Sequence, residues 1–159
     1  MHRMAGPEPL SSKEEELWRI FIRIVKVMPR LLDADLTRGA GMTASEYTTL
    51  MMLSEAPNRE LRMSDLASAT GLSASRTTRL VDDLKSRGLV TKTASSSDAR
   101  ANVTRLTSRG MRKLKTAWPV HLTSVRTRFL DQIPPKSIDC VGKGLNSVAA
   151  HFEDPPSNA

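Results

Sequence analysis

The stretch GLSASRTTRLVDDL, residues 71–84, has the pattern of a helix with two different sides. One side is suited to packing and carries Leu80, Val81 and Leu84, with Thr77 one turn before them. The other side carries hydroxyl and guanidinium groups, at Ser75, Arg76, Arg79 and Ser86. We therefore expect a helix that packs through one side and presents the other to an acidic partner.

The start of this helix is marked by Ser73, whose hydroxyl can accept a hydrogen bond from a backbone N–H two or three residues later. Gly71 permits a sharp turn before it, and residues 64–70 form a short helical pattern with Ser64 as the expected N-cap. Two short helices joined by a glycine-containing turn predict a helix-turn-helix. This pattern alone is moderately specific, because many small α proteins contain it.

The residues after this helix predict a β-hairpin, or wing. Gly88 is expected to end the helix, residues 89–93 to form one strand and residues 102–107 the returning strand. The polar tip between them could instead be a plain serine-rich linker. Within the tip, the carboxylate of Asp98 can orient the guanidinium of Arg100, and an arginine there suits the negative potential of a narrow minor groove.

Positive charge is concentrated around this motif. The 159 residues carry a net charge of +7, whereas residues 59–115 hold 13 basic and five acidic residues, a net charge of +8. The rest of the chain is therefore close to neutral. A solvated charged surface is the plainer explanation, but the concentration is what a phosphate-binding surface requires.

Two capped helices are expected before the motif. Ser12 with Glu15, and Thr43 with Glu46, each form a capping-box pattern. The first helix carries a wide apolar stripe, at Leu17, Ile20, Phe21, Ile24, Met28, Leu31 and Leu32. Pro29 should kink or break it between residues 25 and 29, because proline removes an internal hydrogen bond.

Two apolar helices are also expected after the motif. Ser108 should cap a long helix with a nearly heptad seam, at Met111, Leu114, Trp118, Leu122, Val125 and Phe129. Pro119 should bend this helix and Pro134 should end it. The last helix carries a further stripe, at Ile138, Val141, Leu145, Val148 and Phe152. Core packing could use these stripes, but one small winged domain could hardly cover them, so we expect dimerisation through both ends of the chain.

The sequence therefore predicts a mainly α fold with a small β-wing, as one intertwined domain. Residues 1–10 are expected to form a flexible arm, residues 11–38 and 108–153 dimerisation helices, and residues 42–107 a winged helix-turn-helix domain.

The segment SASRTTRLVDDLKSRGLV, residues 73–90, followed by Asp98-x-Arg100, Val103, Leu106, Thr107 and Gly110, resembles the signature of the multiple-antibiotic-resistance regulator (MarR) family of bacterial transcription factors. The order of elements resembles that family over nearly the whole chain. The resemblance implies a homodimer that straddles a pseudopalindromic operator in double-stranded DNA. It also implies that small, often phenolic, compounds bind between the dimer helices and the DNA-reading domain and weaken DNA binding.

The resemblance assigns DNA-contacting residues as well. The major-groove face matches Ser73, Ala74, Ser75, Arg76, Thr78 and Arg79. Arg76 stands where the family more often has a small polar residue, which suggests a guanine contact. Thr77 stands where a buried aliphatic residue is usual. Arg100, supported by Asp98, is assigned to the minor groove, and the expected phosphate contacts are Arg62, Ser64, Lys92 and Arg105.

Five residues are candidates for an effector pocket: Trp18, Arg23, Tyr47, Met51 and His121. Arg23 could pair with a carboxylate on the effector. A histidine on a helix surface without any ligand role is the plainer interpretation of His121.

Other functions have little support in the sequence. The single cysteine, Cys140, excludes an internal disulfide, and its acidic neighbour Asp139 disfavours the thiolate that a redox sensor needs. The histidines are scattered, so we expect no metal site and no cofactor, and no constellation of residues suggests catalysis. The absence of a signal peptide and of a long apolar run predicts a cytoplasmic protein without membrane contact.

The leading hypothesis is thus a dimeric DNA-binding regulator, a repressor more often than an activator, that a small ligand releases. The alternative is a protein-interaction module whose winged domain docks a partner; a redox sensor based on Cys140 and an enzyme follow at a distance.

Overall fold

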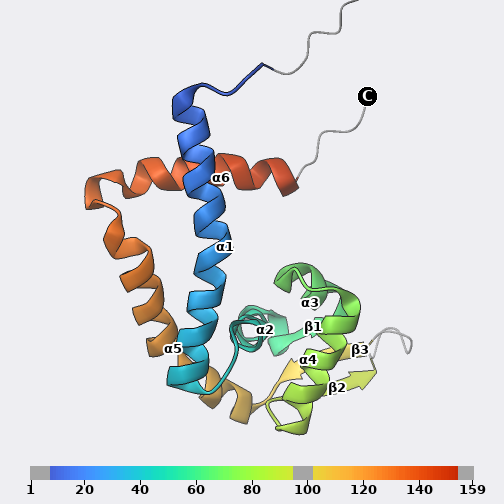
Figure 1. Cartoon of the computed structure of the whole chain (residues 1–159). Coiled ribbons are helices and arrows are strands. Elements are labelled where there is room, and N and C mark those ends of the chain that lie inside the picture. The colour runs from blue at the N-terminus through green and yellow to red at the C-terminus, as the bar shows by residue number, and fades with distance from the viewer. Residues whose placement is uncertain (1–7, 95–101, 154–159) are drawn as a thin grey trace, which may run out of the picture. The chain divides into compact units, whose positions relative to one another are not determined.

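The computed structural model describes residues 8–94 and 102–153. It clusters into two units, Met1–His121 and Leu122–Ala159, each of which is described by itself. The elements of the first unit are α1 (Ser12–Ala40), α2 (Ala44–Glu55), the short 3-10 helix η1 (Pro57–Arg59), β1 (Glu60–Arg62), α3 (Met63–Thr70), α4 (Ala74–Ser86), β2 (Val90–Ala94), β3 (Asn102–Leu106) and most of α5 (Ser108–Arg128). The second unit holds the end of α5, the 3-10 helices η2 (Leu130–Gln132) and η3 (Pro135–Ser137), and α6 (Ile138–Glu153) (Figure 1). The predicted fold class, mainly α with a small β-wing, is confirmed.

The sheet has three antiparallel strands in the order β1-β3-β2. β2 and β3 form the predicted hairpin, in a register that sets Val90 opposite Leu106 and Lys92 opposite Thr104. β1 pairs with the other edge of β3, with Glu60 opposite Arg105. Because β3 lies between the other two strands, the wing is hydrogen-bonded to the segment that leads directly into α3.

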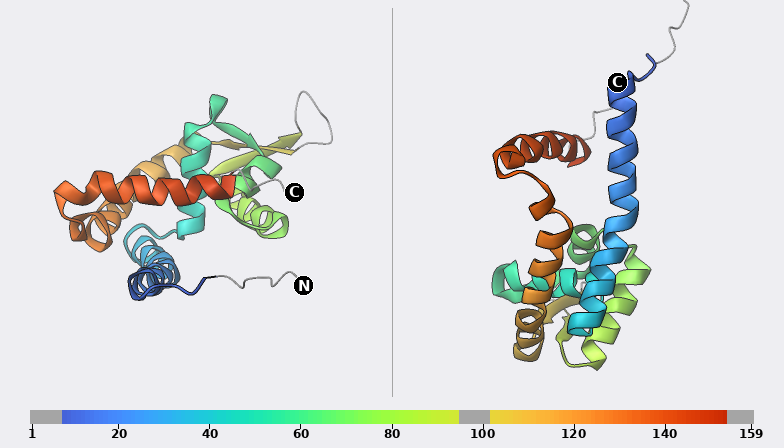
Figure 2. Two further views of the ribbon diagram at one scale, coloured as in Figure 1. Left: turned by 90° about the horizontal axis from the view of Figure 1, so that it is seen from above. Right: turned by 60° about the vertical axis from the view of Figure 1, so that its left-hand side comes forward.

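The hydrophobic core lies where α2, α3 and α4 meet the sheet, close to the C-terminal end of α1 (Figure 2). Leu50, Leu53 and Leu66 are fully buried there, and so are Val81 and Leu84 from the predicted packing side of α4. Thr77, from the same side, is also buried. Its hydroxyl donates a hydrogen bond of 3.1 Å to the Ser73 carbonyl, so the polar atom is satisfied within the helix.

Glycines make the two turns that bound α4. Gly71 ends α3 with a φ of 65°, and Gly88 follows α4 with a φ of 69°. At the second turn the N–H of Leu89 bonds the Leu84 carbonyl and the N–H of Gly88 bonds the Lys85 carbonyl, both at 2.9 Å. This is the Schellman arrangement. The predicted glycine turn and the predicted end at Gly88 are both confirmed.

Helix caps were predicted less accurately than helices. The Thr43–Glu46 capping box is confirmed, with the Thr43 N–H bonding Glu46 at 2.7 Å and the Glu46 N–H bonding the Thr43 hydroxyl at 3.2 Å. The first box is formed by Ser11 and Glu14, and the prediction of Ser12 and Glu15 is wrong. Residues 11–15 contain two overlapping Ser-x-x-Glu patterns, and the earlier one adds one residue to the helix.

Two further caps were predicted wrongly. The N-terminus of α5 is capped by Thr107, whose Oγ1 accepts a hydrogen bond of 3.0 Å from the Gly110 N–H, and not by Ser108. The Thr107 hydroxyl also lies 2.8 Å from the Gly88 carbonyl, so a tertiary contact selects it. Ser64 does not cap α3, because β1 runs straight into the helix through Arg62 and leaves Ser64 inside the first turn.

The prolines interrupt the helices less than expected. We predicted a kink or a break at Pro29; α1 continues from Ser12 to Ala40 through this residue, so the helix does not break there, and the kink stays a prediction. α5 likewise contains Pro119. α5 ends at Arg128, well before Pro134, because the backbone leaves the helical region at Phe129.

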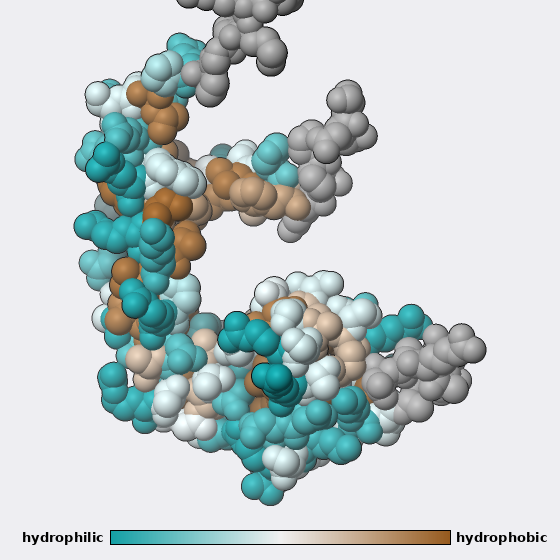
Figure 3. All heavy atoms as spheres, turned by 45° about the vertical axis from the view of Figure 1, so that its right-hand side comes forward, coloured by the Kyte–Doolittle hydropathy of each residue, from teal (hydrophilic) through white to brown (hydrophobic). Residues whose placement is uncertain are grey.

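The predicted apolar stripes remain largely exposed. The only residue of α1 in the buried class is Leu36, whereas Leu17, Trp18 and Val25 are each at least half exposed. On α6, Val148 is 49% and Phe152 75% exposed. Figure 3 shows hydrophobic side chains at the surface of α1 and, separately, of α6. A single chain therefore leaves much of the apolar stripes of α1 and α6 exposed.

Candidate nucleic-acid interface

The first two turns of α4 gather all six residues predicted for the major groove. Each of these side chains is exposed: Ser73, Ala74, Ser75, Arg76, Thr78 and Arg79. The Ser73 hydroxyl caps the helix by accepting a hydrogen bond of 3.4 Å from the Arg76 N–H, as predicted. Thr77, Val81 and Leu84 are buried on the packing side of the same helix.

The arginines of this face are not neutralised by neighbouring carboxylates. No acidic residue lies in the first turn of α4. Among the described residues, neither Arg76 nor Arg79 forms an ion pair. Their guanidinium groups are therefore available to an external acceptor, such as a base edge or a phosphate.

The four residues predicted to contact phosphates differ from one another in the structure. Arg62 and Ser64 are exposed, and the Ser64 hydroxyl bonds the Asp65 carboxylate at 3.1 Å. Lys92 lies 3.2 Å from Asp82, and Arg105 bonds one oxygen of Glu60 through Nε at 2.8 Å and Nη2 at 2.5 Å. Lys92 and Arg105 thus already have carboxylate partners, which the sequence reasoning missed.

The predicted minor-groove residues, Asp98 and Arg100, lie outside the described residues. The strands that lead towards them are described up to Ala94 and again from Asn102.

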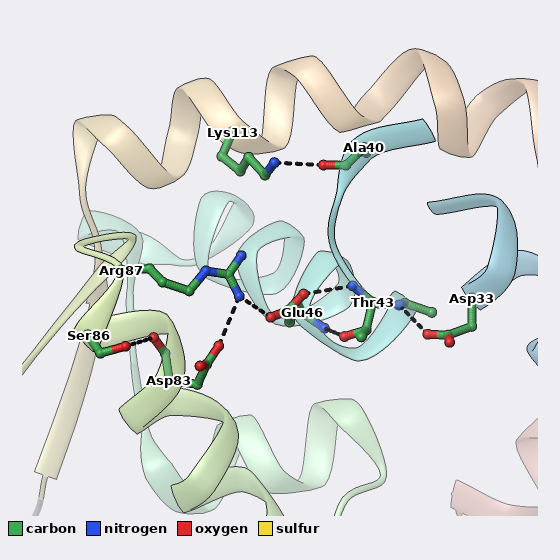
Figure 4. Close-up of polar contacts among 9 residues, drawn as sticks. Asp33, Ala40, Thr43, Glu46, Asp83, Ser86, Arg87 and Lys113 are labelled. Carbon is green, nitrogen blue, oxygen red and sulfur yellow. Dashed lines mark hydrogen bonds and ion pairs between the residues drawn. The ribbon is translucent and has the colours of Figure 1, made fainter. Parts of the chain in front are cut away.

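A polar cluster fixes the C-terminal end of α4 to the start of α2 (Figure 4). Arg87 donates to Glu46 and, at 2.9 Å, to Asp83. Burial acts to lower the pKa of Arg87, but the hydrogen bonds that it donates to Asp83 and Glu46, and the charges of these two carboxylates, outweigh burial, so the pKa is raised above its ordinary value. Glu46 also holds the Thr43 N–H, so this carboxylate joins the cap of α2 to the reading helix.

Two further hydrogen bonds connect α1 to the neighbouring segments of α2 and α5. The Asp33 carboxylate accepts a hydrogen bond of 2.8 Å from the Ala44 N–H, and Lys113 Nζ donates to the Ala40 carbonyl at 2.6 Å (Figure 4). The sequence showed Glu46 as a capping residue but gave no sign of Arg87, because the two are 41 positions apart.

The predicted effector residues form two groups. Trp18 and Arg23 line an open hollow of about 410 Å³ whose walls all come from residues 18–30 of α1. Tyr47 and His121 stack on each other, with ring centroids 4.4 Å apart, and Trp118 lies 6.3 Å from His121. Met51 is partly buried against the core.

The Tyr47–His121 stack contains polar atoms without partners. Among the described residues, Tyr47 Oη, Thr49 Oγ1 and His121 Nδ1 are buried and lack a hydrogen bond. Burial raises the pKa of Tyr47, helped by the charge of Glu55, and burial lowers the pKa of His121. Unsatisfied polar atoms of this kind are costly unless a further group supplies the bond.

The lowered pKa of His121 predicts a pH-dependent stability. The folded protein binds this proton less readily than the unfolded chain, whose histidine has the ordinary value of 6.5. The stabilisation is therefore present above that value and is lost as the pH falls below it, by at most about 1.4 kcal/mol per pH unit. Urea unfolding from about pH 7.5 to 5 should show this loss, and His121→Phe, which keeps an aromatic ring, should lose less. Equal losses in both proteins would contradict the assignment.

Other kinds of site find no support in the part of the chain that the structure describes. Within residues 8–94 and 102–153, no three metal-ligating side chains are grouped to hold an ion. No helix in those residues is long and apolar enough to cross a membrane. Cys140 is exposed on α6, and its redox role stays an untested prediction.

The helix-turn-helix, the wing strands and the basic face of α4 together define a winged-helix DNA-binding protein. A model of the MarR family matches residues 40–101. The crystal structure of Sco3205, a MarR family transcriptional regulator from Streptomyces coelicolor in complex with DNA, is 31% identical, with a TM-score of 0.86 over 96% of each chain. AbsC, a MarR family regulator from the same organism, is 30% identical, with a TM-score of 0.83 over 92% of this chain and 99% of that one.

A further relative is YfiV from Bacillus subtilis (strain 168), an uncharacterized HTH-type transcriptional regulator. It is 28% identical over 145 residues, which span 91% of this chain and 88% of YfiV. The chain belongs to the MarR family, and it is a DNA-binding transcriptional regulator rather than an enzyme.

Proposed function

We propose that this regulator acts as a homodimer that reads a pseudopalindromic operator, with one α4 in the major groove at each half-site. The observation that carries the proposal is the exposed first half of α4, where Arg76 and Arg79 have no carboxylate partner among the described residues. The DNA complex of Sco3205 supports it, because that relative covers 96% of this chain.

In this proposal the three predicted sets of contacts act differently. Ser73, Ala74, Ser75, Arg76, Thr78 and Arg79 face base edges, which carry sequence information. Arg100, oriented by Asp98, enters the flanking minor groove. Arg62, Ser64, Lys92 and Arg105 contact phosphates, which fix position and register.

Selection of binding sites from random duplex DNA tests the proposal directly. A dimer with one reading helix per subunit should enrich a two-fold-symmetric consensus whose half-sites lie about 10 base pairs apart. Failure to enrich any consensus, combined with capture of a stable protein partner, would favour the interaction-module alternative.

Arg76→Ala should relax specificity at one position of each half-site. An arginine that bonds a guanine through two hydrogen bonds discriminates by about 1–3 kcal/mol against the wrong base, and alanine cannot replace those bonds. Binding measurements on operators with single base changes should show the loss at that position alone. Lys85→Ala, an exposed cation near the other end of the same helix, is the matched control and should leave base preference unchanged.

The exposed stripes of α1 and α6 support the dimer. Large exposed apolar surfaces are uncommon on monomeric proteins. Leu17 and Val148 are 67% and 49% exposed, so changing them removes little packing within one chain. Their burial would come from a second copy.

Leu17→Asp and Val148→Asp should therefore weaken self-association at least about tenfold without lowering the stability of the isolated chain, since a carboxylate resists burial in an apolar interface. Analytical ultracentrifugation over a range of concentrations measures this. Glu16→Ala, on an exposed neighbour in α1, is the control. A monomeric wild-type protein at high concentration would refute the dimer.

We further propose that a small aromatic acid weakens DNA binding. The Tyr47–His121 stack with its unpartnered polar atoms, and Arg23 in the hollow on α1, support an aromatic ligand with an acidic group. Repeating the binding measurement with hydroxybenzoate tests this, and Tyr47→Phe tests whether the hydroxyl takes part. Unchanged DNA affinity with a panel of aromatic acids would count against an aromatic effector.

A further inference from the structure

A second hollow, at the junction of α4 with α5, has the character of an anion site. It is open to solvent, has a volume of about 590 Å³ and is lined by Arg87, Leu89, Arg109, Arg112, Lys113 and Thr116. Four of these six side chains are cations and none is a carboxylate. One of these cations, Arg87, is the C-cap residue of α4. The other three lie in the first turns of α5, so both helices contribute to the hollow.

The charges of this hollow are only partly compensated. Arg87 is held by two carboxylates, those of Asp83 and Glu46. Lys113 bonds the Ala40 carbonyl, which holds its ammonium in place but does not cancel its charge. Arg109 and Arg112 are exposed and form no ion pair among the described residues. The four cations and the two carboxylates that pair with Arg87 leave a net charge of +2 around this hollow.

One of the cations, Lys113, is also held in position. Its ammonium donates a hydrogen bond to the Ala40 carbonyl at the end of α1, and the Arg109 side chain lies near the Gly88 turn. Preorganised cations bind an anion at a lower entropy cost than free side chains. Arginine guanidinium groups match the geometry of phosphate oxygens through paired hydrogen bonds.

The hollow is separate from the reading face of α4. Arg87 follows Arg76 by 11 positions, which at 1.5 Å per residue places them about 16 Å apart along the axis. The predicted base-contacting residues all lie in the first two turns of that helix, whereas the hollow begins beyond its last turn.

We propose that this hollow binds a small polyanion that carries phosphate groups, of about the size of a nucleotide or a diphosphate. Its volume lies within the range of about 300–1,000 Å³ that small-molecule sites occupy. The net charge of +2 favours a ligand with two or more negative charges. The site is distinct from the aromatic effector residues, none of which lines it.

Isothermal titration of the full-length protein with pyrophosphate tests the site. Saturable binding is expected for the wild type, and Arg109→Ala/Arg112→Ala should weaken it at least about tenfold, because both arginines without an ion-pair partner are lost. Arg112→Gln alone should weaken it to a smaller extent and covers the case in which the double variant fails to fold. Lys115→Ala, an exposed cation of the same helix outside the hollow, should bind as the wild type does.

Three results would overturn the proposal. The first is no saturable binding of pyrophosphate, and the second is equal binding by the wild type and the double variant, which would place the anion outside this hollow. The third is a loss of operator affinity by the double variant in buffer without pyrophosphate, which would make the hollow a contact for DNA phosphates. Unchanged operator affinity in that buffer supports a small-molecule ligand.

Discussion

Replacing Gly110 by alanine should destabilise the winged domain by about 3 kcal/mol or more, because overpacking against an immovable neighbour costs at the upper end of its usual range. A β-carbon at this position would lie 2.1 Å from the Leu89 carbonyl oxygen and 2.7 Å from Leu106 Cδ1. The closest atom belongs to the backbone, so no side-chain rotation relieves the clash. The Leu89 carbonyl also accepts hydrogen bonds from Thr107, through its N–H at 3.1 Å and its hydroxyl at 3.0 Å.

Moving the backbone to admit the methyl group would therefore open the junction between the end of α4, the sheet and the start of α5. Urea unfolding of wild type and variant measures the cost. Gly142→Ala is the matched control: this glycine lies inside α6 with nothing within 4 Å of a β-carbon, so alanine should be neutral or should stabilise by about 0.5–1 kcal/mol. Equal stability of Gly110→Ala and wild type would contradict the close approach of α5 to Leu89.

The sequence predicted the helix-turn-helix and wing because their signals are local. Gly71, Ser73 and Gly88 mark turns and caps by their own conformational preferences, and the structure places each of them as predicted. The predicted N-cap of α5 was wrong because a tertiary contact decides which of two neighbouring hydroxyl residues caps the helix. Thr107 caps α5 in place of Ser108 because its hydroxyl also reaches the Gly88 carbonyl, 19 positions earlier.

Pairings between distant segments could not be predicted from the sequence. Nothing in the pattern around Glu46 points to Arg87, and nothing around Arg105 points to Glu60, 45 positions away. The six predicted base-contacting residues were assigned from the resemblance to the MarR family; the structure leaves all six exposed at the start of α4, and their contact with bases stays a prediction. The effector residues were scattered over several elements, and the structure brings only Tyr47 and His121 into contact.

The Glu60–Arg105 ion pair complicates the use of Arg105 variants to test the predicted phosphate contacts. Arg105 is 60% exposed, yet its guanidinium is shared with a carboxylate that DNA would repel. Removing Arg105 would leave Glu60 uncompensated next to the proposed DNA path, so the loss of affinity would exceed that of one phosphate contact. Arg62, which has no ion-pair partner among the described residues, offers the cleaner measurement.

Operator affinity is expected to fall by about 10³–10⁵ between about 50 and 200 mM salt, as 6–10 phosphate contacts release their counterions. This is the largest effect that we predict, and it follows from the net charge of +8 in residues 59–115. Fluorescence anisotropy with labelled operator DNA over a salt series measures the slope. A slope near zero would contradict binding through a phosphate-contacting surface.

Arg62→Ala should then reduce the salt slope by about 1 and weaken binding to all sequences alike, since a phosphate contact carries no base information. Glu60→Gln should act in the opposite direction, because it frees the Arg105 guanidinium and removes a negative charge. Lys143→Ala, an exposed cation of α6, should leave the slope unchanged. If Arg62→Ala instead altered base preference at one position, Arg62 would be a base contact. Base recognition would then not be confined to α4, as we propose, with β1 and the wing contacting only the DNA backbone.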